Sequence, residues 1–453
     1  MTYVPHTPAD RVAMLEAIGA RSIADLFGSI PAEARMDGAL DLPDSLDEAA
    51  LLRHLTRMAG RNDDLDRYAC FLGAGVYDHF GPSVVDALAS RGEFLTAYTP
   101  YQPEMSQGML QAIYEYQSLV CRLTGMELAN ASMYDGATAL AEAALMAVDV
   151  TGRDTVVASS AIHPHYRRVV RTYIRTSGFQ YREAPHRDGA LDTAALGSVL
   201  DGGTACLLTQ YPSFFGCVHD LAAAQSAAAA AGALSVVCAD PVALGLLKPP
   251  GEFGVDVVVG EGQALGCPMA FGGPLLGFFA CKLAYQRRFP GRIVGATRDL
   301  AGRRAYTMTL RTREQDIRRE RATSNICTNE ALLALAATIY LCAVGRNGLR
   351  EVADRCVQKA HYAADRLCAL PGVSLAFERP FFKEFALRLP PGTQVAALNR
   401  RLRESGVIGG YDLGLAYPEL AGHALLCVTE NRTREEIDRM VSTTASALRE
   451  GVS

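Results

Sequence analysis

The chain has 453 residues, enough for one large domain and one or two smaller ones. Apolar residues make up 49% and charged residues 21%, which is typical of a folded globular protein. The formal net charge of −5 argues against nucleic acid or an anionic membrane as a partner, because both attract basic proteins. Twelve scattered cysteines without C-x-x-C spacing favour reduced thiols in the cytoplasm.

Residues 1–64 are predicted to form a helical arm. Thr7 and Asp10 are candidate caps for a helix that runs to about Ile18, and two further helical segments follow. The N-terminus lacks the apolar core of a signal peptide. We expect this arm to pack on another surface.

Residues 65–330 alternate short apolar runs with helical stretches. The runs are TVVAS, FQYREA, ACLLTQ, LSVVCAD, VDVVV and LLGFFAC. Such alternation predicts an α/β domain with a mainly parallel sheet, whose ligands lie at the carboxyl ends of the strands. Residues 331–453 are predicted to form a smaller α+β C-terminal domain that begins with a long helix. Its apolar start, Ala331–Gly345, is shorter than a membrane span and predicts a buried helix.

Asp240 and Gln263 follow neighbouring apolar runs of this pattern. Many enzymes that use pyridoxal phosphate (PLP) place an aspartate on the pyridine nitrogen and a Schiff-base lysine at two such positions. The segment VDVVVGEGQALGCPMAFGGP has the framework of a lysine site, but Gln263 stands where the amine is expected. The chain has only four lysines: Lys248, Lys282, Lys359 and Lys383. None follows a predicted strand at the cofactor position.

Two further segments are candidates for cofactor contacts. Gly136 and Thr138 begin an alanine-rich helix whose N-terminus is a candidate phosphate site, with an ordinary helix capped by Asp135 as the alternative. His163 or His165 is a candidate to stack on a cofactor ring, and a local hydrogen bond is the alternative. No carboxylate or thiol lies at ligand spacing from these histidines, so no metal site is expected.

Three polar segments are candidates for an active-site wall or an interface. The loop YTPYQPEMSQG presents Tyr98, Tyr101 and Gln102 on a backbone stiffened by prolines. The arginine-rich segment 310–332 carries Arg311 and Asn325; a solvated helix with i,i+4 ion pairs is the simpler interpretation, and a grip on a carboxylate is the alternative. The glycines of FLGAGVYDHFGP lack dinucleotide-site spacing and favour a flexible loop near the pocket mouth.

The segments FLGAGVYDHFGP, YTPYQPEMSQG, NASMYDGATALAEA and TREQDIRRERATSNICTNEAL together resemble the N-terminal-half subunit of the glycine cleavage system P-protein. The likeness covers nearly the whole chain. It implies the PLP-dependent transferase-like fold of aspartate aminotransferase, fold type I.

The resemblance also implies a split enzyme, in which a homologous subunit 2 carries PLP on a lysine at the position of Gln263. Asp240, Gly136 and Thr138 are then vestigial cofactor-binding residues, and no catalytic residue is expected in this chain alone. The assembled enzyme is expected to decarboxylate glycine as glycine dehydrogenase (aminomethyl-transferring). It is expected to pass the aminomethyl group to the lipoyl arm of H-protein and to work with the T- and L-proteins.

Two alternatives stay open. The first is a free-standing PLP enzyme that uses another lysine, although none of the four lysines is well placed for this role. The second is a structural or regulatory pseudoenzyme that contributes nothing to an active site, against which the polar-aromatic loop 98–108 argues mildly.

Overall fold

The computed structural model describes residues 5–36, 38, 40–326 and 329–451. The chain divides into two compact units, Met1–Asp63 and Asp64–Ser453. The domain boundaries predicted at residues 64 and 330 stay predictions.

The first unit consists of short helices that bury none of their described side chains. Its elements are α1 (Pro8–Ala17), two 3-10 helices (Ile23–Phe27 and Ala32–Ala34) and α2 (Glu48–Ala59). Thr7 and Asp10 form a reciprocal capping box at the start of α1, so both predicted caps take part. Many large apolar side chains of this unit are exposed, among them Val12, Ile18, Leu26, Phe27, Leu51, Leu55 and Met58.

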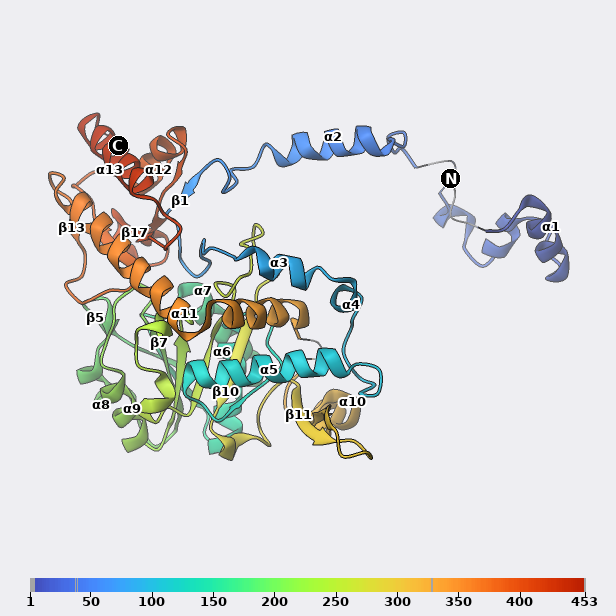
Figure 1. The fold of residues 1–453 in the computed structure, drawn as a ribbon, viewed down its shortest axis with the longest axis horizontal. Helices are drawn as coiled ribbons and strands as arrows, with labels where there is room; N and C mark the ends of the chain where they lie inside the picture. Colours follow the sequence, from blue (N-terminus) through green and yellow to red (C-terminus); the bar gives the residue numbers. More distant parts are fainter. Residues whose placement is uncertain (1–4, 37, 39, 327–328, 452–453) are drawn as a thin grey trace. The chain divides into compact units, whose positions relative to one another are not determined.

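A seven-stranded sheet forms the centre of the second unit (Figure 1). In spatial order its strands are β2 (Leu128–Ala129), β10 (Gly277–Cys281), β9 (Val257–Glu261), β8 (Leu234–Ala239), β7 (Thr204–Tyr211), β3 (Thr155–Ser159) and β4 (Gln180–Ala184). The five strands from β9 to β4 are parallel, and β10 runs antiparallel to both of its neighbours. The predicted mainly parallel α/β sheet is therefore confirmed.

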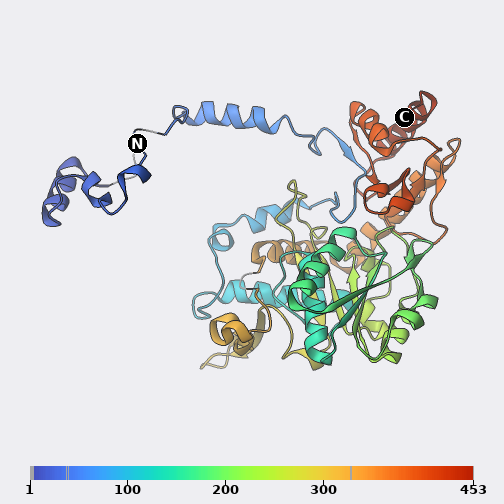
Figure 2. The same ribbon diagram turned by 180° about the vertical axis from the view of Figure 1, so that it is seen from behind.

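Helices cover both faces of the sheet because successive residues of a strand point to opposite sides. In β8, Val236 and Cys238 pack in one apolar cluster with α6 (Gly136–Thr151) and α7 (Pro164–Ser177). Val237 and Ala239 pack in another, with α5 (Gln107–Thr124) and α11 (Ala331–Cys368). Figure 1 shows α5 and α11 in front of the strands, and Figure 2 shows the opposite face with α6 and α7.

The long helix α11 is a core helix. By length and composition alone it is the one helix among the described residues that would be able to cross a membrane. However, Ala334, Ala337 and Tyr340 are buried in the cluster that contains α5 and the sheet, as predicted for this stretch. Gly345, with φ of 60° and ψ of −174°, breaks the helix near its middle.

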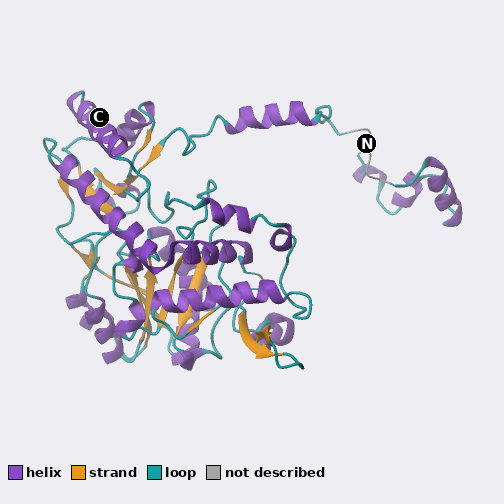
Figure 3. Cartoon of the chain, in the orientation of Figure 1, coloured by secondary structure: helices purple, strands orange, loops and turns teal. Residues whose placement is uncertain are grey.

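A second, antiparallel sheet lies in the C-terminal part of the chain (Figure 3). Its strands are β13 (Ser374–Leu375), β14 (Glu384–Arg388), β17 (His423–Cys427) and β16 (Tyr411–Asp412), and it shares an apolar cluster with α12 (Val395–Glu404) and α13 (Arg434–Arg449). The remaining helices are α3 (Ser83–Ala89), α4 (Gly92–Leu95), α8 (Leu196–Val199), α9 (Leu221–Ala230) and α10 (Gln315–Arg318). Three strand pairs complete the unit: β1 (Ala69–Cys70) with β15 (Val407–Ile408), β5 (His186–Arg187) with β6 (Ala190–Leu191), and β11 (Ile293–Arg298) with β12 (Arg304–Thr309).

A continuous solvated helix is wrong for the arginine-rich segment. Residues 311–321 form three short helical turns instead. Arg313 is buried, and its guanidinium donates to the carbonyl groups of Phe289, Gly291 and Leu310. These bonds hold the chain in an irregular path that charge spacing alone does not reveal.

Candidate functional site

The predicted site residues His163, Asp240 and Gln263 follow the carboxyl ends of β3, β8 and β9. Parallel neighbouring strands end at the same edge of a sheet, which is where ligands of such folds bind. The structure therefore places these residues at the expected edge of the sheet.

The Gln263 side chain is buried and fully engaged. Its Oε1 accepts a hydrogen bond from the backbone N–H of Tyr77 at 2.9 Å. Its Nε2 donates to the carbonyl oxygens of Tyr77 and Cys267 at 3.0 and 2.8 Å. The amide therefore ties the end of β9 to the segment 71–82, and a carboxamide cannot form an imine with an aldehyde.

Asp240 is paired with a cation that comes from the chain itself. Lys383 is only 1% exposed, and its Nζ lies 2.7 Å from Oδ2 of Asp240. Burial acts to lower the pKa of Lys383, but the Asp240 carboxylate outweighs it and raises that pKa; in turn Lys383 lowers the pKa of Asp240 against the effect of burial. Both groups are therefore charged. The same ammonium lies 3.5 Å from the centroid of the Tyr77 ring, a cation–π contact.

His79 extends this pair into a buried chain of polar groups. Its Nε2 lies 2.9 Å from Nζ of Lys383, which can only donate, so Nδ1 carries the proton and donates to Glu430 at 2.6 Å. Burial raises the pKa of Glu430, but the hydrogen bonds from His79 and from the backbone N–H of Phe80 outweigh it and lower the pKa.

His79, Cys356 and Glu430 also bring ligand-type atoms within 4.8 Å of one another. A metal on Nδ1 of His79 would leave Nε2 as the protonated nitrogen, facing the Lys383 ammonium. We therefore assign this cluster to hydrogen bonding.

Glu261 occupies the N-terminus of α6. Its Oε2 accepts from the backbone N–H of Gly136 at 3.0 Å, and its Oε1 accepts from the N–H groups of Gln263 and Leu276 at 3.0 and 2.8 Å. Asp135 caps the helix in a capping box with Thr138, so the alternative of an ordinary capped helix describes this terminus. Burial raises the pKa of Glu261 to about 7, against the lowering effect of the three N–H groups.

Glu384 and His163 hold the start of the segment 71–82. The Glu384 carboxyl group accepts from the N–H of Ala74 at 2.7 Å and from the Tyr77 hydroxyl at 2.9 Å. His163 makes one local hydrogen bond, in which Nδ1 accepts from the N–H of His165, and one distant contact, in which Nε2 lies 2.8 Å from the carbonyl oxygen of Ala74. The expected flexible loop is thus a tightly held segment.

These residues do not fit PLP. The phosphate of PLP would meet the Glu261 carboxylate at the helix N-terminus, and its pyridine nitrogen would compete with Lys383 for Asp240. Position 263 offers no amine, and the protonated, paired Lys383 is not a nucleophile. A free-standing PLP enzyme that uses another lysine is therefore not supported.

The other predicted candidates lie on the surface. Tyr98, Tyr101, Gln102 and Asn325 are exposed, and Arg311 is partly exposed. Arg292, which is buried, donates to the Tyr101 hydroxyl at 2.8 Å, and the guanidinium of Arg311 lies 5.8 Å from the Tyr101 ring centroid. Tyr101 and Arg311 thus form one aromatic–cationic cluster. Among the described residues, no hydrogen bond or ion pair joins this cluster to Gln263.

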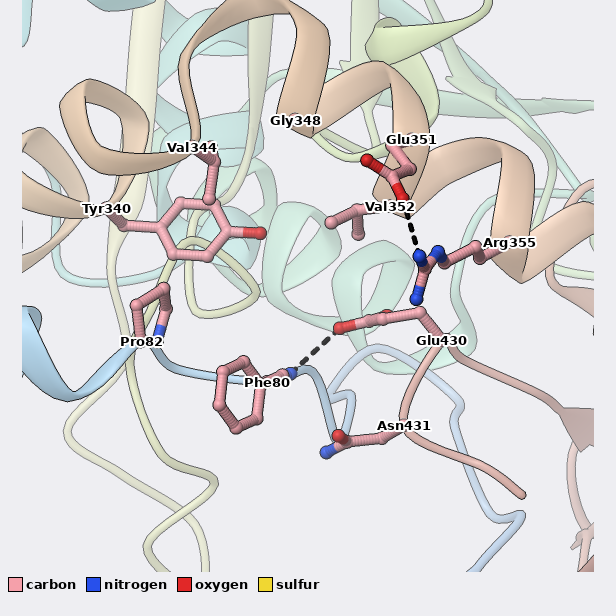
Figure 4. A pocket seen from close by; sticks show the side chains of 10 residues that line it. All are labelled: Phe80, Pro82, Tyr340, Val344, Gly348, Glu351, Val352, Arg355, Glu430 and Asn431. Atoms are coloured by element: carbon pink, nitrogen blue, oxygen red, sulfur yellow. Dashed lines mark hydrogen bonds and ion pairs between the residues drawn. The ribbon is translucent and has the colours of Figure 1, made fainter.

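A cavity of about 350 Å³ lies beside the buried polar chain (Figure 4). Phe80, Glu430 and Tyr340 line it, and Glu430 accepts from the backbone N–H of Phe80 at 2.8 Å. The Tyr340 hydroxyl points into the cavity. Glu430 therefore connects the cavity wall to the same network that reaches Asp240.

The family model described as glycine cleavage system P-protein matches residues 1–444. The chain belongs to this family. It is 53% identical over 442 residues to a probable glycine dehydrogenase (decarboxylating) subunit 1 from Desulforamulus reducens, covering 98% of this chain and 99% of that one. It is 51% identical to the protein of the same name from Thermomicrobium roseum, covering all of both chains.

A solved structure supports the same assignment. The crystal structure of an inhibitor-bound glycine decarboxylase (P-protein) of the glycine cleavage system superposes with a TM-score of 0.90 at 45% identity, covering 98% of this chain and 100% of that one. A sphingosine-1-phosphate lyase from Burkholderia pseudomallei, at 17% identity and a TM-score of 0.67, shows the fold alone. This P-protein chain has the fold of PLP-dependent transferases of type I, as predicted.

Sequence reasoning missed several residues that complete the site: Tyr77, His79, Glu261, Lys383 and Glu384. Tyr77 and His79 lie in FLGAGVYDHFGP, one of the segments on which the P-protein resemblance depends. Glu261 stands two residues before Gln263, at the end of a buried strand. The available signal for Lys383 was its rarity, because it is one of only four lysines.

We expect Glu261→Gln to lower the free energy of unfolding by about 1–3 kcal/mol at pH 8, because an amide offers one oxygen to three N–H donors. Urea unfolding measures the change. Glu252→Gln, at an exposed position, is the control and is expected to change stability by less than about 0.5 kcal/mol. Equal stability of both variants would contradict the assigned contacts.

We also expect a pH dependence that Glu384 causes. Burial raises its pKa to about 7, so the folded chain keeps a proton that the unfolded chain releases near its ordinary pKa of 4.5. The contribution of Glu384 to stability therefore falls as the pH rises from about 5 to 7. Unfolding of the native chain and of Glu384→Gln across this range isolates the effect, because the other groups titrate in both. A stability difference that stays constant with pH would contradict the protonated state.

Proposed function

We propose that this chain is subunit 1 of a two-subunit glycine decarboxylase, in which a homologous subunit 2 holds PLP on a lysine. The observation that carries the proposal is Gln263, a buried amide at the lysine position of a site that its own side chains fill. The likeness to chains named subunit 1, over the full length of both, supports the same role.

The assembled enzyme decarboxylates glycine in the cytoplasm and transfers the aminomethyl group to the lipoyl arm of H-protein. The T- and L-proteins act with this enzyme in the glycine cleavage system. PLP on subunit 2 supplies the electron sink for decarboxylation. This chain supplies the structural support for that subunit.

The surface cluster around Tyr101 is the best candidate for an active-site wall or entry path. Arg292 and Arg311 place two guanidinium groups over the Tyr101 ring. Tyr98 stands 71% exposed three residues earlier, and Gln102 is exposed beside Tyr101. Arg292 and Arg311 also pair with Glu314 and Asp316, so the cluster is aromatic and polar, which suits a boundary through which the zwitterion glycine enters.

The first unit is the best candidate for the contact with subunit 2. In α2, Leu51, Leu55 and Met58 recur at helical spacing on one face, and all three are exposed. An exposed apolar face of this kind normally packs against a partner.

We expect the purified chain alone to retain no PLP as an imine after dialysis and to show no exchange of CO₂ into glycine. Exchange is expected when subunit 2 is added, with subunit 2 alone as the control. Gln263→Lys is expected to stay inactive, because the lysine would leave the N–H of Tyr77 without its acceptor, while Glu261 would still occupy the N–H of Gly136 and Lys383 would still pair with Asp240. Glycine–CO₂ exchange by this chain alone would rule out the proposal.

We further expect Leu51→Asp with Leu55→Asp to weaken association with subunit 2 at least tenfold, because both charges would be buried in the interface. Sedimentation of mixed subunits measures this change. Ala49→Asp with Thr56→Asp adds the same charge to the opposite side of α2 and is expected to leave association unchanged. An equal effect of the two pairs would show that the apolar face is not the contact.

A further inference from the structure

In enzymes of this fold that bind PLP, the cofactor contacts the protein at three positions. An aspartate after one strand pairs with the protonated pyridine nitrogen, and the N-terminus of a helix receives the phosphate. The residue after the next strand joins the ring covalently through a lysine. In this chain the corresponding groups are Asp240, the N–H of Gly136 and Gln263, and each one is already bonded to another part of the same molecule.

We propose that Lys383, Glu261 and Tyr77 together act as an internal surrogate for the cofactor. The Lys383 ammonium takes the place of the pyridinium, and the Glu261 carboxylate takes the place of the phosphate. The Tyr77 ring lies against the ammonium and fills the space of the aromatic ring. The cofactor site thus survives as a binding site whose ligand is built into the chain.

Above about pH 7, where Glu261 is ionised, the signs of the charges support the substitution. Asp240 needs a cation, and Lys383 supplies one at 2.7 Å. The N-terminus of α6 attracts an anion, and Glu261 accepts from its first N–H at 3.0 Å. These two groups come from different parts of the chain, one from the start of the second sheet and one from the end of β9. An unrelated salt bridge would explain the first contact but not the second.

Glycines allow the segment that carries Tyr77 to enter the site. A Cβ on Gly73 would lie 2.4 Å from Cβ of Cys427, and a Cβ on Gly75 would lie 3.0 Å from the His163 ring. Both glycines have positive φ, of 58° and 102°. The backbone at Gly75 therefore covers the ring of His163, one of the two histidines that are candidates to stack on a cofactor.

The surrogate also fixes the segment 71–82 between the two sheets. Gln263 holds Tyr77 from the first sheet, while Glu384 holds Ala74 from β14 of the second. Farther along, Asp78 accepts from Asn431 at 3.0 Å and pairs with Arg432. The two sheets are thus joined through one segment, where a bound cofactor would otherwise lie.

The test is to remove the surrogate and offer the ligand that it replaces. The probes are 4-deoxypyridoxine and its 5′-phosphate, which lack the aldehyde and cannot form imines with surface lysines. The variants of the full chain are Tyr77→Ala with Lys383→Ala, and the same pair with Glu261→Ala added. Equilibrium dialysis measures binding, and thermal unfolding measures stabilisation by the probe.

The native chain is expected to bind neither probe. The double variant is expected to bind the unphosphorylated probe at least as well as the phosphate, because Glu261 repels the phosphate. Adding Glu261→Ala is expected to favour the phosphate at least tenfold, and adding Asp240→Asn to the triple variant is expected to abolish binding of both probes.

The surrogate is ruled out if the variants fold and bind neither probe, or if the native chain binds as tightly as they do. A double variant that folds neither alone nor with millimolar probe also rules it out, since the probe should restore the missing partner of Asp240. The test uses no glycine, CO₂ or partner subunit, so its failure leaves the proposed function untouched.

Discussion

The buried ion pair between Lys383 and Asp240 is the constraint on which the rest of the site depends. Such pairs contribute little net stability, because desolvation of both charges offsets their attraction. Loss of one partner is costly, however, because it leaves the other charge buried and unpaired. Lys383 must therefore stay beside Asp240, and this requirement fixes the second sheet against the edge of the first.

The segment 71–82 is arranged around that pair. The Tyr77 ring lies against the ammonium, and His79 accepts a hydrogen bond from it. The other ring nitrogen of His79 donates a hydrogen bond to the ionised carboxylate of Glu430. Every link in this chain has a donor facing an acceptor, so a buried polar network forms without an orphaned group between Asp240 and Glu430. The low dielectric of the interior strengthens each of these bonds.

The sequence predicted the parts of this structure that depend on local pattern. The strands β3, β7 and β8 were predicted from apolar runs of the right length. The capping role of Asp135 was predicted from its place before an alanine-rich helix. The position of Gln263 followed from the strand and loop around it.

The contact between Lys383 and Asp240 was out of reach, because it joins residues 143 positions apart and no periodicity records such a pairing. The role of Glu261 was missed for a related reason. Its buried carboxylate depends on three backbone N–H donors that only the folded structure brings together. The path of residues 311–321 depends on Arg313 and the carbonyl groups that it reaches, which again are tertiary contacts.

The hydrogen bonds of Gln263 show why glutamine suits this position. Its amide both accepts from and donates to Tyr77, and it uses its second N–H on Cys267. A lysine can only donate, so at this position it would leave the N–H of Tyr77 unsatisfied. Glutamine is therefore the better residue once the site is filled from within. The absence of an amine at position 263 and the internal contacts of its amide support each other, so this chain keeps the fold of PLP-dependent transferases with its own side chains filling this edge of the sheet.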